Sequence, residues 1–130
     1  MNKIRGARQE LKVIKKLKEL GFHGLKSSRS ESKNLDNDLI DIADVDNILP
    51  CYVQIKATVA NPQYHKIITD CPRKDKPMVI FHNKQYKIEG GVKQQSQGEY
   101  FITTSEFGYE LLRVYALYNK LIEPEEQITE

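Results

Sequence analysis

The sequence predicts an α/β fold, with a central mixed β-sheet flanked by helices. An amphipathic helical pattern opens the chain, β-prone runs follow in two groups, and a second long helical pattern comes near the end. Helices and strands that alternate along one chain pack in layers, because each element must bury its apolar side against another.

Length and composition indicate one soluble domain. The chain has 130 residues, 39% hydrophobic and 29% charged, so we expect a domain over 1–123 and an acidic tail over 124–130. The longest apolar runs, such as 78–81, are far shorter than the roughly 18 residues of a membrane span. The N-terminus lacks the apolar segment of a signal peptide, which predicts a cytoplasmic protein. Cys51 and Cys71 are expected to be reduced, and their surroundings match no zinc-binding pattern.

The first half of the chain contains one helix and two strands. The helix is predicted from Ile4 to Leu20, where apolar residues recur at steps of three or four, and Gly21 ends it. Residues 24–37 have no periodicity and predict an exposed loop. Two β-prone runs, 39–43 and 52–57, flank a turn-forming segment and predict a β-hairpin.

The second half continues the alternation. A short helix over 62–70 and a strand over 78–82 come first, and 86–89 and 100–103 then supply one strand each around a polar loop over 90–98. Thr103 and Glu106 have the spacing of a capping box and mark the start of the last helix, which Pro124 ends. Its apolar residues exceed a single stripe, which suits a dimer interface.

Charge is unevenly distributed along the chain, although the net charge is only +2. Residues 1–35 carry ten lysines and arginines against three glutamates, and five aspartates then crowd into 36–46. This asymmetry suggests a phosphate-binding surface beside a cation-binding pocket, with a solvated basic helix face as the alternative.

Two polar side chains interrupt the second β-prone run. Because side chains alternate along a strand, Gln54 and Lys56 are predicted to share one face. Val53 and Ile55 then point the other way, into apolar packing. A lysine in a buried strand needs a partner of opposite charge. Asp38 is the candidate, since hairpin pairing would bring it close to Lys56.

Phosphodiester hydrolysis uses such a set of groups. Carboxylate and carbonyl oxygens hold a hard cation such as Mg²⁺, which activates water and neutralises charge on the phosphate. Asp38 would be the principal ligand, with the Gln54 amide oxygen and the Ile55 carbonyl completing the shell. Lys56 would orient the water or stabilise the transition state. Glu10 borders the apolar stripe of the first helix without a charged helical neighbour, so it is a further ligand, directly or through water.

In order and spacing, these elements resemble the PD-(D/E)xK nuclease superfamily, and most of all the archaeal-type Holliday junction resolvases, which also occur in viruses. The resemblance covers most of the chain. Residues 6–11 are similar to the family's opening helix, with Glu10 at its acidic position, and 28–30 to the loop that follows. Residues 38–40 are similar to the aspartate-leading strand, 54–56 to the E-x-K element, and 76–80 to the next strand.

The resemblance implies a restriction-endonuclease-like core and a homodimer with two basic grooves and two active sites. Such a dimer makes paired, Mg²⁺-dependent nicks in four-way DNA junctions during recombination and repair, with Mn²⁺ as a substitute metal. A viral member would work in the host cytoplasm. The expected contacts to DNA are made by basic and hydroxyl side chains near the N-terminus: Lys3, Arg5, Arg8, Lys26, Arg29 and Ser30.

One position departs from the family pattern, which has glutamate where this chain has Gln54. An amide oxygen is a weaker ligand for Mg²⁺ than a carboxylate. Activity is still expected, with Asp36, Asp41 or Glu10 compensating for the missing charge. Three alternatives stay open: a repair or restriction-type nuclease with another substrate, a DNA-binding member that has lost catalysis, and a purely structural interaction protein. His65 and His82 are interpreted as structural.

Overall fold

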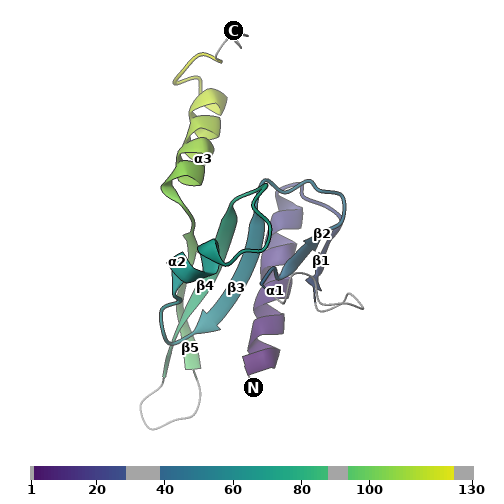
Figure 1. The fold of residues 1–130 in the computed structure, drawn as a ribbon, viewed down its shortest axis with the longest axis vertical. Helices are drawn as coiled ribbons and strands as arrows, with labels where there is room; N and C mark the ends of the chain where they lie inside the picture. Colours follow the sequence, from purple (N-terminus) through teal and green to yellow (C-terminus); the bar gives the residue numbers. More distant parts are fainter. Residues whose placement is uncertain (1, 29–38, 88–93, 125–130) are drawn as a thin grey trace.

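The computed structural model of the chain describes residues 2–28, 39–87 and 94–124. No helix within these ranges is long and apolar enough to cross a membrane. The elements follow one another in the order α1 (Asn2–Glu19), β1 (Leu25–Ser27), β2 (Ile42–Asp44), β3 (Tyr52–Thr58), α2 (Tyr64–Thr69), β4 (Met78–Lys87), β5 (Gln94–Ile102) and α3 (Ser105–Tyr118) (Figure 1).

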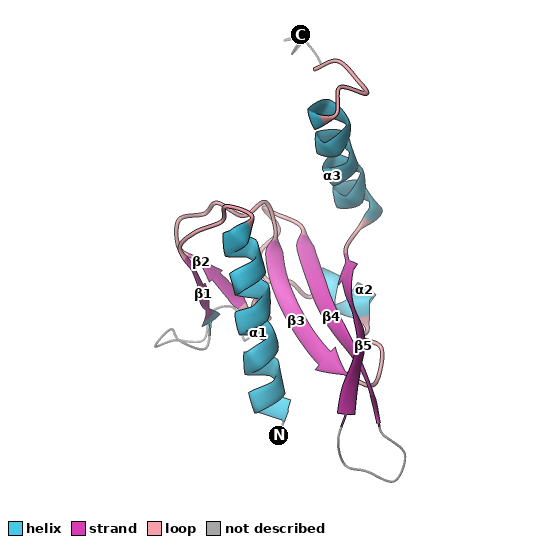
Figure 2. Ribbon diagram, turned by 180° about the vertical axis from the view of Figure 1, so that it is seen from behind, coloured by secondary structure: helices cyan, strands magenta, loops and turns pink. Residues whose placement is uncertain are grey.

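A three-stranded mixed sheet forms the centre of the fold. Its order is β3-β4-β5, with β3 parallel to β4 and β4 antiparallel to β5. Helix α1 lies in front of the sheet in Figure 2 and α2 lies behind it, so the two helices cover opposite faces. The predicted mixed sheet with flanking helices is therefore confirmed. The strand predicted over 86–89 is the end of β4 as far as Lys87, and β5 begins within the predicted loop, at Gln94.

A separate two-stranded sheet pairs β1 with β2 in antiparallel register, Leu25 opposite Asp44. The prediction of a hairpin between 39–43 and 52–57 is therefore wrong, and so is the prediction of an exposed loop where β1 forms. Leu25 has only 3% of its surface exposed, and its burial stabilises the pairing of β1 with β2. The rest of the predicted loop, 29–37, lies outside the described residues.

Side-chain hydrogen bonds, and not pairing of β2 with β3, hold the segment between these two strands in place. The Asp44 carboxylate accepts hydrogen bonds from the Ile48 and Leu49 amides at 3.0 and 2.8 Å. The Lys76 ammonium donates to the Leu49 carbonyl at 2.7 Å and lies 3.6 Å from the Asp44 carboxylate. The conformation of this segment therefore depends on Lys76, which is distant in sequence, and the turn-forming residues alone do not predict it.

Helix α1 ends as the sequence predicts. Gly21 adopts a φ of 107°, which a residue with a Cβ disfavours. The Phe22 amide donates to the Leu17 carbonyl at 3.0 Å, and the Gly21 amide donates to the Lys18 carbonyl at 3.0 Å. These two bonds form a Schellman motif, which satisfies the last carbonyls of the helix.

The main core lies between α1 and the sheet. Val13 and Ile14 of α1 pack with Val53 and Ile55 of β3 and with Phe107 from the base of α3. A smaller cluster on the other face joins Ile40, Cys71 and Met78 under α2. Both cysteines are free, as predicted, and burial raises the pKa of the Cys51 thiol to about 11.

Helix α3 differs from the other two because it projects away from the sheet (Figures 1 and 2). Its N-cap is Thr104, one residue after the predicted cap, and the Thr104 hydroxyl accepts from the Phe107 amide at 3.3 Å. The helix ends at Tyr118, six residues before Pro124. Lys120, two residues after the helix end, adopts a positive φ of 58°. The expectation that every helix lies on a face of the sheet is therefore wrong for α3.

Candidate active site

The alternation of β3 separates two chemically different faces. The odd-numbered Val53 and Ile55 enter the core beneath α1. The even-numbered Gln54 and Lys56 line a cavity of about 450 Å³ on the other face, beside α2. Leu39 and a stretch from Thr58 to Asp70 complete the wall of this cavity. The polar pair that interrupts the strand therefore shares one face and one cavity.

Gln54 carries an unusual buried group. The residue has 5% of its surface exposed, and its side-chain oxygen Oε1 has no hydrogen-bond partner among the described residues. Leaving a buried acceptor unsatisfied costs roughly 1–3 kcal/mol. Lys56 is half-buried, and no ion pair to its ammonium is present in the described part of the chain. Both side chains thus present unused hydrogen-bonding capacity at the cavity.

Asp41 lies at the edge of β3, next to these two residues. Its backbone amide donates to the Val53 carbonyl at 2.8 Å, and its carboxylate oxygen Oδ2 accepts from the Ile55 amide at 2.6 Å. Asp41 is therefore the acid that the structure places beside the Gln54-x-Lys56 segment. Sequence reasoning gave it only a compensating role. Its position inside the apolar run 39–43 is the signal that could have singled it out.

Glu10 is deeply buried on α1, with 2% of its surface exposed. Its carboxylate accepts a hydrogen bond from the Ser27 hydroxyl of β1 at 2.7 Å. The next residue, Ser28, donates its amide to the Asp41 carbonyl at 2.9 Å. Ser27, the last residue of β1, and Ser28, which follows it, thus connect Glu10 to Asp41. Glu10 does not line the Gln54 cavity, because α1 covers the opposite face of the sheet.

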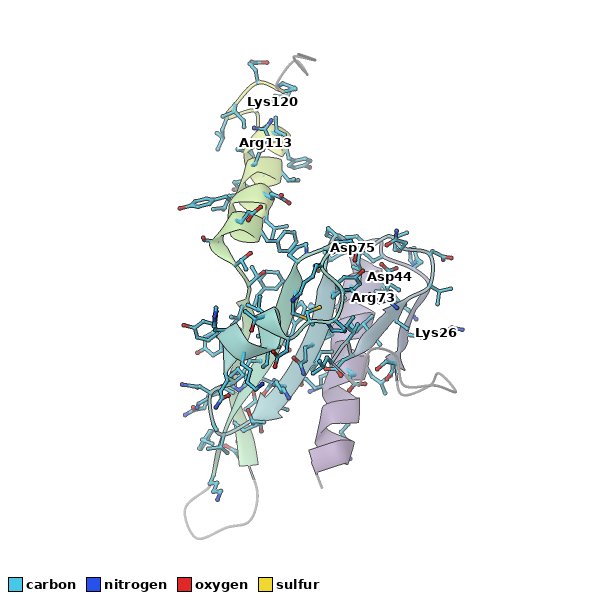
Figure 3. The ribbon with its side chains drawn as sticks, in the orientation of Figure 1. Lys26, Asp44, Arg73, Asp75, Arg113 and Lys120 are labelled. Atoms are coloured by element: carbon cyan, nitrogen blue, oxygen red, sulfur yellow. The ribbon has the colours of Figure 1, made fainter. Side chains whose placement is uncertain are left out.

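Several predicted site residues fall outside the described ranges or on partly described segments. Asp38, Asp36, Arg29 and Ser30 lie outside the described residues, and the side chains of Lys3 and Arg5 are likewise not described. Arg8 on α1 and Lys26 on β1 are exposed. Figure 3 shows Lys26 at the outer side of the β1–β2 pair. Both side chains are therefore accessible to a ligand from solvent.

His82 stands opposite Lys56 in the β3–β4 register and is almost fully buried. Its Nε2 lies 3.1 Å from the Thr58 hydroxyl and 3.2 Å from the Thr58 carbonyl. Burial lowers the pKa of His82, which favours the neutral ring.

On the α2 wall of the cavity, the exposed Lys66 forms an ion pair of 2.6 Å with Asp70, which raises the pKa of Lys66. Lys66 was not singled out from the sequence, because a lysine four residues before an aspartate is an ordinary helical ion pair.

The donor atoms at β3 suit a hard cation. Among the described residues no group of three His, Cys, Asp or Glu side chains could hold a metal ion. However, the Asp41 carboxylate and the Gln54 amide offer oxygens of the kind that Mg²⁺ prefers. A cation at Gln54 Oε1 would also satisfy the one buried oxygen that no described donor satisfies.

Comparisons of the chain with protein-family models, curated proteins and solved structures gave no match. Its function is therefore inferred from its own residues and their arrangement.

Proposed function

We propose that this chain is a metal-dependent endonuclease of the restriction-endonuclease-like fold that cuts branched DNA. One observation carries the proposal: an acid that precedes β2 is hydrogen-bonded to the stretch of β3 that carries an ammonium group and an amide oxygen with no partner among the described residues. These groups are Asp41 at the Ile55 amide, Gln54 with its buried Oε1, and Lys56 beside the same cavity. They follow the order of the acid and the E-x-K element in the nuclease family that the sequence resembles.

Each group has a role in phosphodiester hydrolysis. Asp41 and Gln54 would hold Mg²⁺, with Asp38 as the further acid expected from the sequence, whereas Glu10, the other expected acid, lies outside the Gln54 cavity. When bound, the cation supplies Lewis acidity to the phosphate and makes water easier to deprotonate. Lys56 places a positive charge where the phosphate gains negative charge. The water oxygen bonds to phosphorus while one ester P–O bond breaks, which leaves a hydroxyl end and a phosphate end.

Binding of DNA in this proposal is electrostatic. Arg8 and Lys26 are exposed, and Lys3, Arg5 and Arg29 add to the basic N-terminal region in the sequence. Contacts of lysine and arginine to phosphates release counterions, so affinity for DNA falls steeply as salt is raised. Such contacts carry no sequence information, which suits an enzyme that recognises the shape of a junction.

The test is cleavage of an end-labelled four-way junction by purified protein with Mg²⁺. Wild type should give paired nicks, and Lys56→Ala should lower the rate by about 100-fold, equivalent to roughly 2.7 kcal/mol of activation free energy. Lys18→Ala, which removes an equal charge from an exposed site on α1, should cut within about twofold of wild type. A folded, junction-bound wild type that leaves the junction uncut would contradict the proposal.

The substrate itself is tested in the same assay. Flap, mismatched and plain duplex DNA, each with the same label, should be cut more slowly than the junction. Faster cleavage of any of these would replace the resolvase assignment with a repair or restriction-type nuclease, while leaving the active site unchanged.

A second candidate, a DNA-binding protein without catalysis, is favoured by the amide at position 54. Gln54 offers a weaker oxygen ligand than the carboxylate usual in the family. This candidate predicts salt-sensitive junction binding that neither EDTA nor Lys56→Ala alters by more than about twofold. Any Mg²⁺-dependent cleavage by wild type removes it.

A further inference from the structure

Strand β5 forms an uncovered edge of the three-stranded sheet. Strand β4 pairs with one side of it, and no strand among the described residues pairs with the other side. Figure 2 shows β5 at the edge of the sheet that lies away from the β1–β2 pair. The residues of β5 from Glu99 to Phe101 are all exposed. An edge strand turns every second backbone N–H and C=O outward, where the backbone of a further strand can pair with them.

The opposite edge of the sheet, at β3, is occupied by the chain itself. The Asp41 amide donates to the Val53 carbonyl at 2.8 Å, and the Ile55 amide donates to the Asp41 carboxylate at 2.6 Å. Other edges are protected by lysine, by proline or by a bulge. Strand β5 contains neither lysine nor proline, and its register with β4 is irregular only where it skips Gln97. Residues 98–102 therefore pair regularly with β4 and keep an unprotected outer edge.

A groove lies beside this edge, between α1 and strands β4 and β5. It has a volume of about 630 Å³, and Phe81, Asn83, Glu99 and Phe101 line it from the sheet. The Phe81 and Phe101 rings meet edge to face, with their centroids 5.3 Å apart. Phe101 is still 48% exposed, although Phe81 packs against it from β4. A side chain of a strand added beyond β5 would be the cross-strand neighbour of Phe101 on its other side.

The α1 side of the groove is positively charged. Lys12 and Lys15 line it, are exposed and have no ion pair in the described part of the chain. The acids of the groove are already engaged, because Glu19 pairs with Lys16 at 3.9 Å and Glu99 accepts a hydrogen bond from the α1 side. A ligand that presents carboxylates toward α1 would therefore be attracted to this groove.

We infer that the chain binds an extended acidic segment of another protein, which adds to the free edge of β5 as a further strand. Its backbone would pair with β5, and because side chains alternate along a strand, every second one would lie over the groove. An apolar side chain there would cover Phe101, and carboxylates on the same face would meet Lys12 and Lys15. A helix in this groove would leave the backbone of β5 unpaired. Binding of the segment does not depend on the proposed nuclease activity.

The positions of the two lysines set the spacing of the ligand. The hydrogen bond from Gln9 to Glu99 places these two residues at one level, and α1 and β5 run in the same direction (Figure 2). From that level, Lys12 and Lys15 lie about 4.5 and about 9 Å further along α1. Phe101 lies about 7 Å further along β5. The lysines thus lie on either side of the level of Phe101, which favours a ligand whose apolar residue has an acidic residue two positions away on each side.

The test is binding of a fluorescein-labelled synthetic peptide to the full chain, followed by fluorescence anisotropy without added metal. The peptide has nine residues, as many as β5, and alternates threonine with glutamate, phenylalanine, glutamate and valine, in that order. Wild type should bind it saturably, and lysine in place of both glutamates should weaken binding by about tenfold. Methylating every second backbone nitrogen gives two further peptides. The one whose methyl groups face β5 should bind about tenfold more weakly than the other, because it cannot donate to the edge.

Variants of the chain test the two sides of the groove. Phe101→Thr keeps a strand-forming residue and should weaken binding by about tenfold, the effect of losing one anchor side chain. Reversing two charges in Lys12→Glu/Lys15→Glu should weaken binding by about fivefold. Lys18→Glu/Lys74→Glu makes the same charge change at exposed sites outside the groove and should bind within about twofold of wild type.

Absence of saturable binding up to about 1 mM protein would overturn the inference, and so would equal affinities of the two methylated peptides. Displacement of the peptide by plain duplex DNA would assign the groove to nucleic acid instead. Binding that weakens as the concentration of the chain rises would assign the edge to a second copy. Far-UV circular dichroism checks that each variant is folded, and Leu20→Ser, at a groove residue that is 72% exposed, replaces Phe101→Thr if that variant is not.

Discussion

The two faces of β3 differ in how well folding alone explains them. On the α1 side, Val53 and Ile55 are buried among apolar neighbours and contribute to stability in the ordinary way. On the α2 side, Gln54 keeps a buried oxygen that no donor of the described residues reaches, and Lys56 lies beside a cavity. Such a cost to stability is typical of positions retained for function. The comparison therefore separates residues that build the protein from residues that we propose act on a substrate.

The largest expected effect tests which acid serves the polar face. Asp41→Asn should lower Mg²⁺-dependent cleavage of the junction by about 1,000-fold, roughly 4 kcal/mol in activation free energy, because it removes the carboxylate that is hydrogen-bonded to the Ile55 amide, between Gln54 and Lys56 in β3. Asp46→Asn, an exposed aspartate of the same acidic stretch, is the matched control and should cut at the wild-type rate.

Asp38→Asn, measured beside these two, extends the comparison to the acid that the sequence first suggested. Equal losses from Asp38→Asn and Asp41→Asn would mean that both are ligands. Retention of more than a tenth of the activity by Asp41→Asn would show that Asp41 is not a ligand.

The apolar face should respond in stability rather than in chemistry. Val53→Ala should lower the free energy of unfolding by about 2 kcal/mol, because it leaves a cavity in the main core. Urea unfolding followed by circular dichroism measures this loss. Cleavage by the folded variant well below its unfolding midpoint should stay close to that of wild type. A strong loss of cleavage by the fully folded Val53→Ala variant would contradict the division of β3 into a structural face and a functional face.

Gln54→Leu should have the opposite pattern from Val53→Ala. Removing the oxygen that has no partner among the described residues should raise the free energy of unfolding by about 1 kcal/mol, while cleavage is lost with the proposed metal ligand. In Gln54→Glu, a buried carboxylate should destabilise the protein in EDTA, and Mg²⁺ should restore stability by binding the folded state. Unfolding curves with EDTA and with Mg²⁺ measure both effects. A destabilised Gln54→Leu would indicate that Oε1 has a structural partner.

The smallest expected effect is the pH dependence contributed by His82. Because its folded pKa lies below the ordinary 6.5, the unfolded chain binds more protons as the pH falls. The stability due to neutral His82 is therefore present above about pH 6.5 and is lost as the pH falls toward the folded pKa. His82→Gln should flatten this slope in unfolding measurements between about pH 7.5 and about pH 5.5. His65→Gln, at an exposed histidine of α2, should leave the slope unchanged.

Elements with a strong local period could be predicted from the sequence, and those that depend on distant contacts could not. The apolar period of α1 and its terminal Gly21 determine that helix locally, and β3 and α2 were likewise predicted close to their observed positions. The pairing of β2 with β1, by contrast, depends on burial of Leu25 and on Lys76 reaching back to the turn. Neither effect has a signal within a short window of sequence.

The candidate site shows the same limit. The shared face of Gln54 and Lys56 follows from strand alternation, which is local. The choice among five neighbouring aspartates is not local, because it depends on which carboxylate reaches the β3 backbone, and Asp41 does so at the Ile55 amide. The outward direction of α3 was equally beyond prediction, since it depends on where Phe107 enters the core.

The most direct test of the central claim is a crystal of the protein soaked in Mn²⁺, with anomalous diffraction collected to locate the ion. The account predicts an anomalous peak in contact with Gln54 Oε1 and the Asp41 carboxylate, on the side of β3 that faces α2. A structure in which Mn²⁺ occupies no position near these oxygens, while Gln54 Oε1 is satisfied by a protein donor, would contradict it.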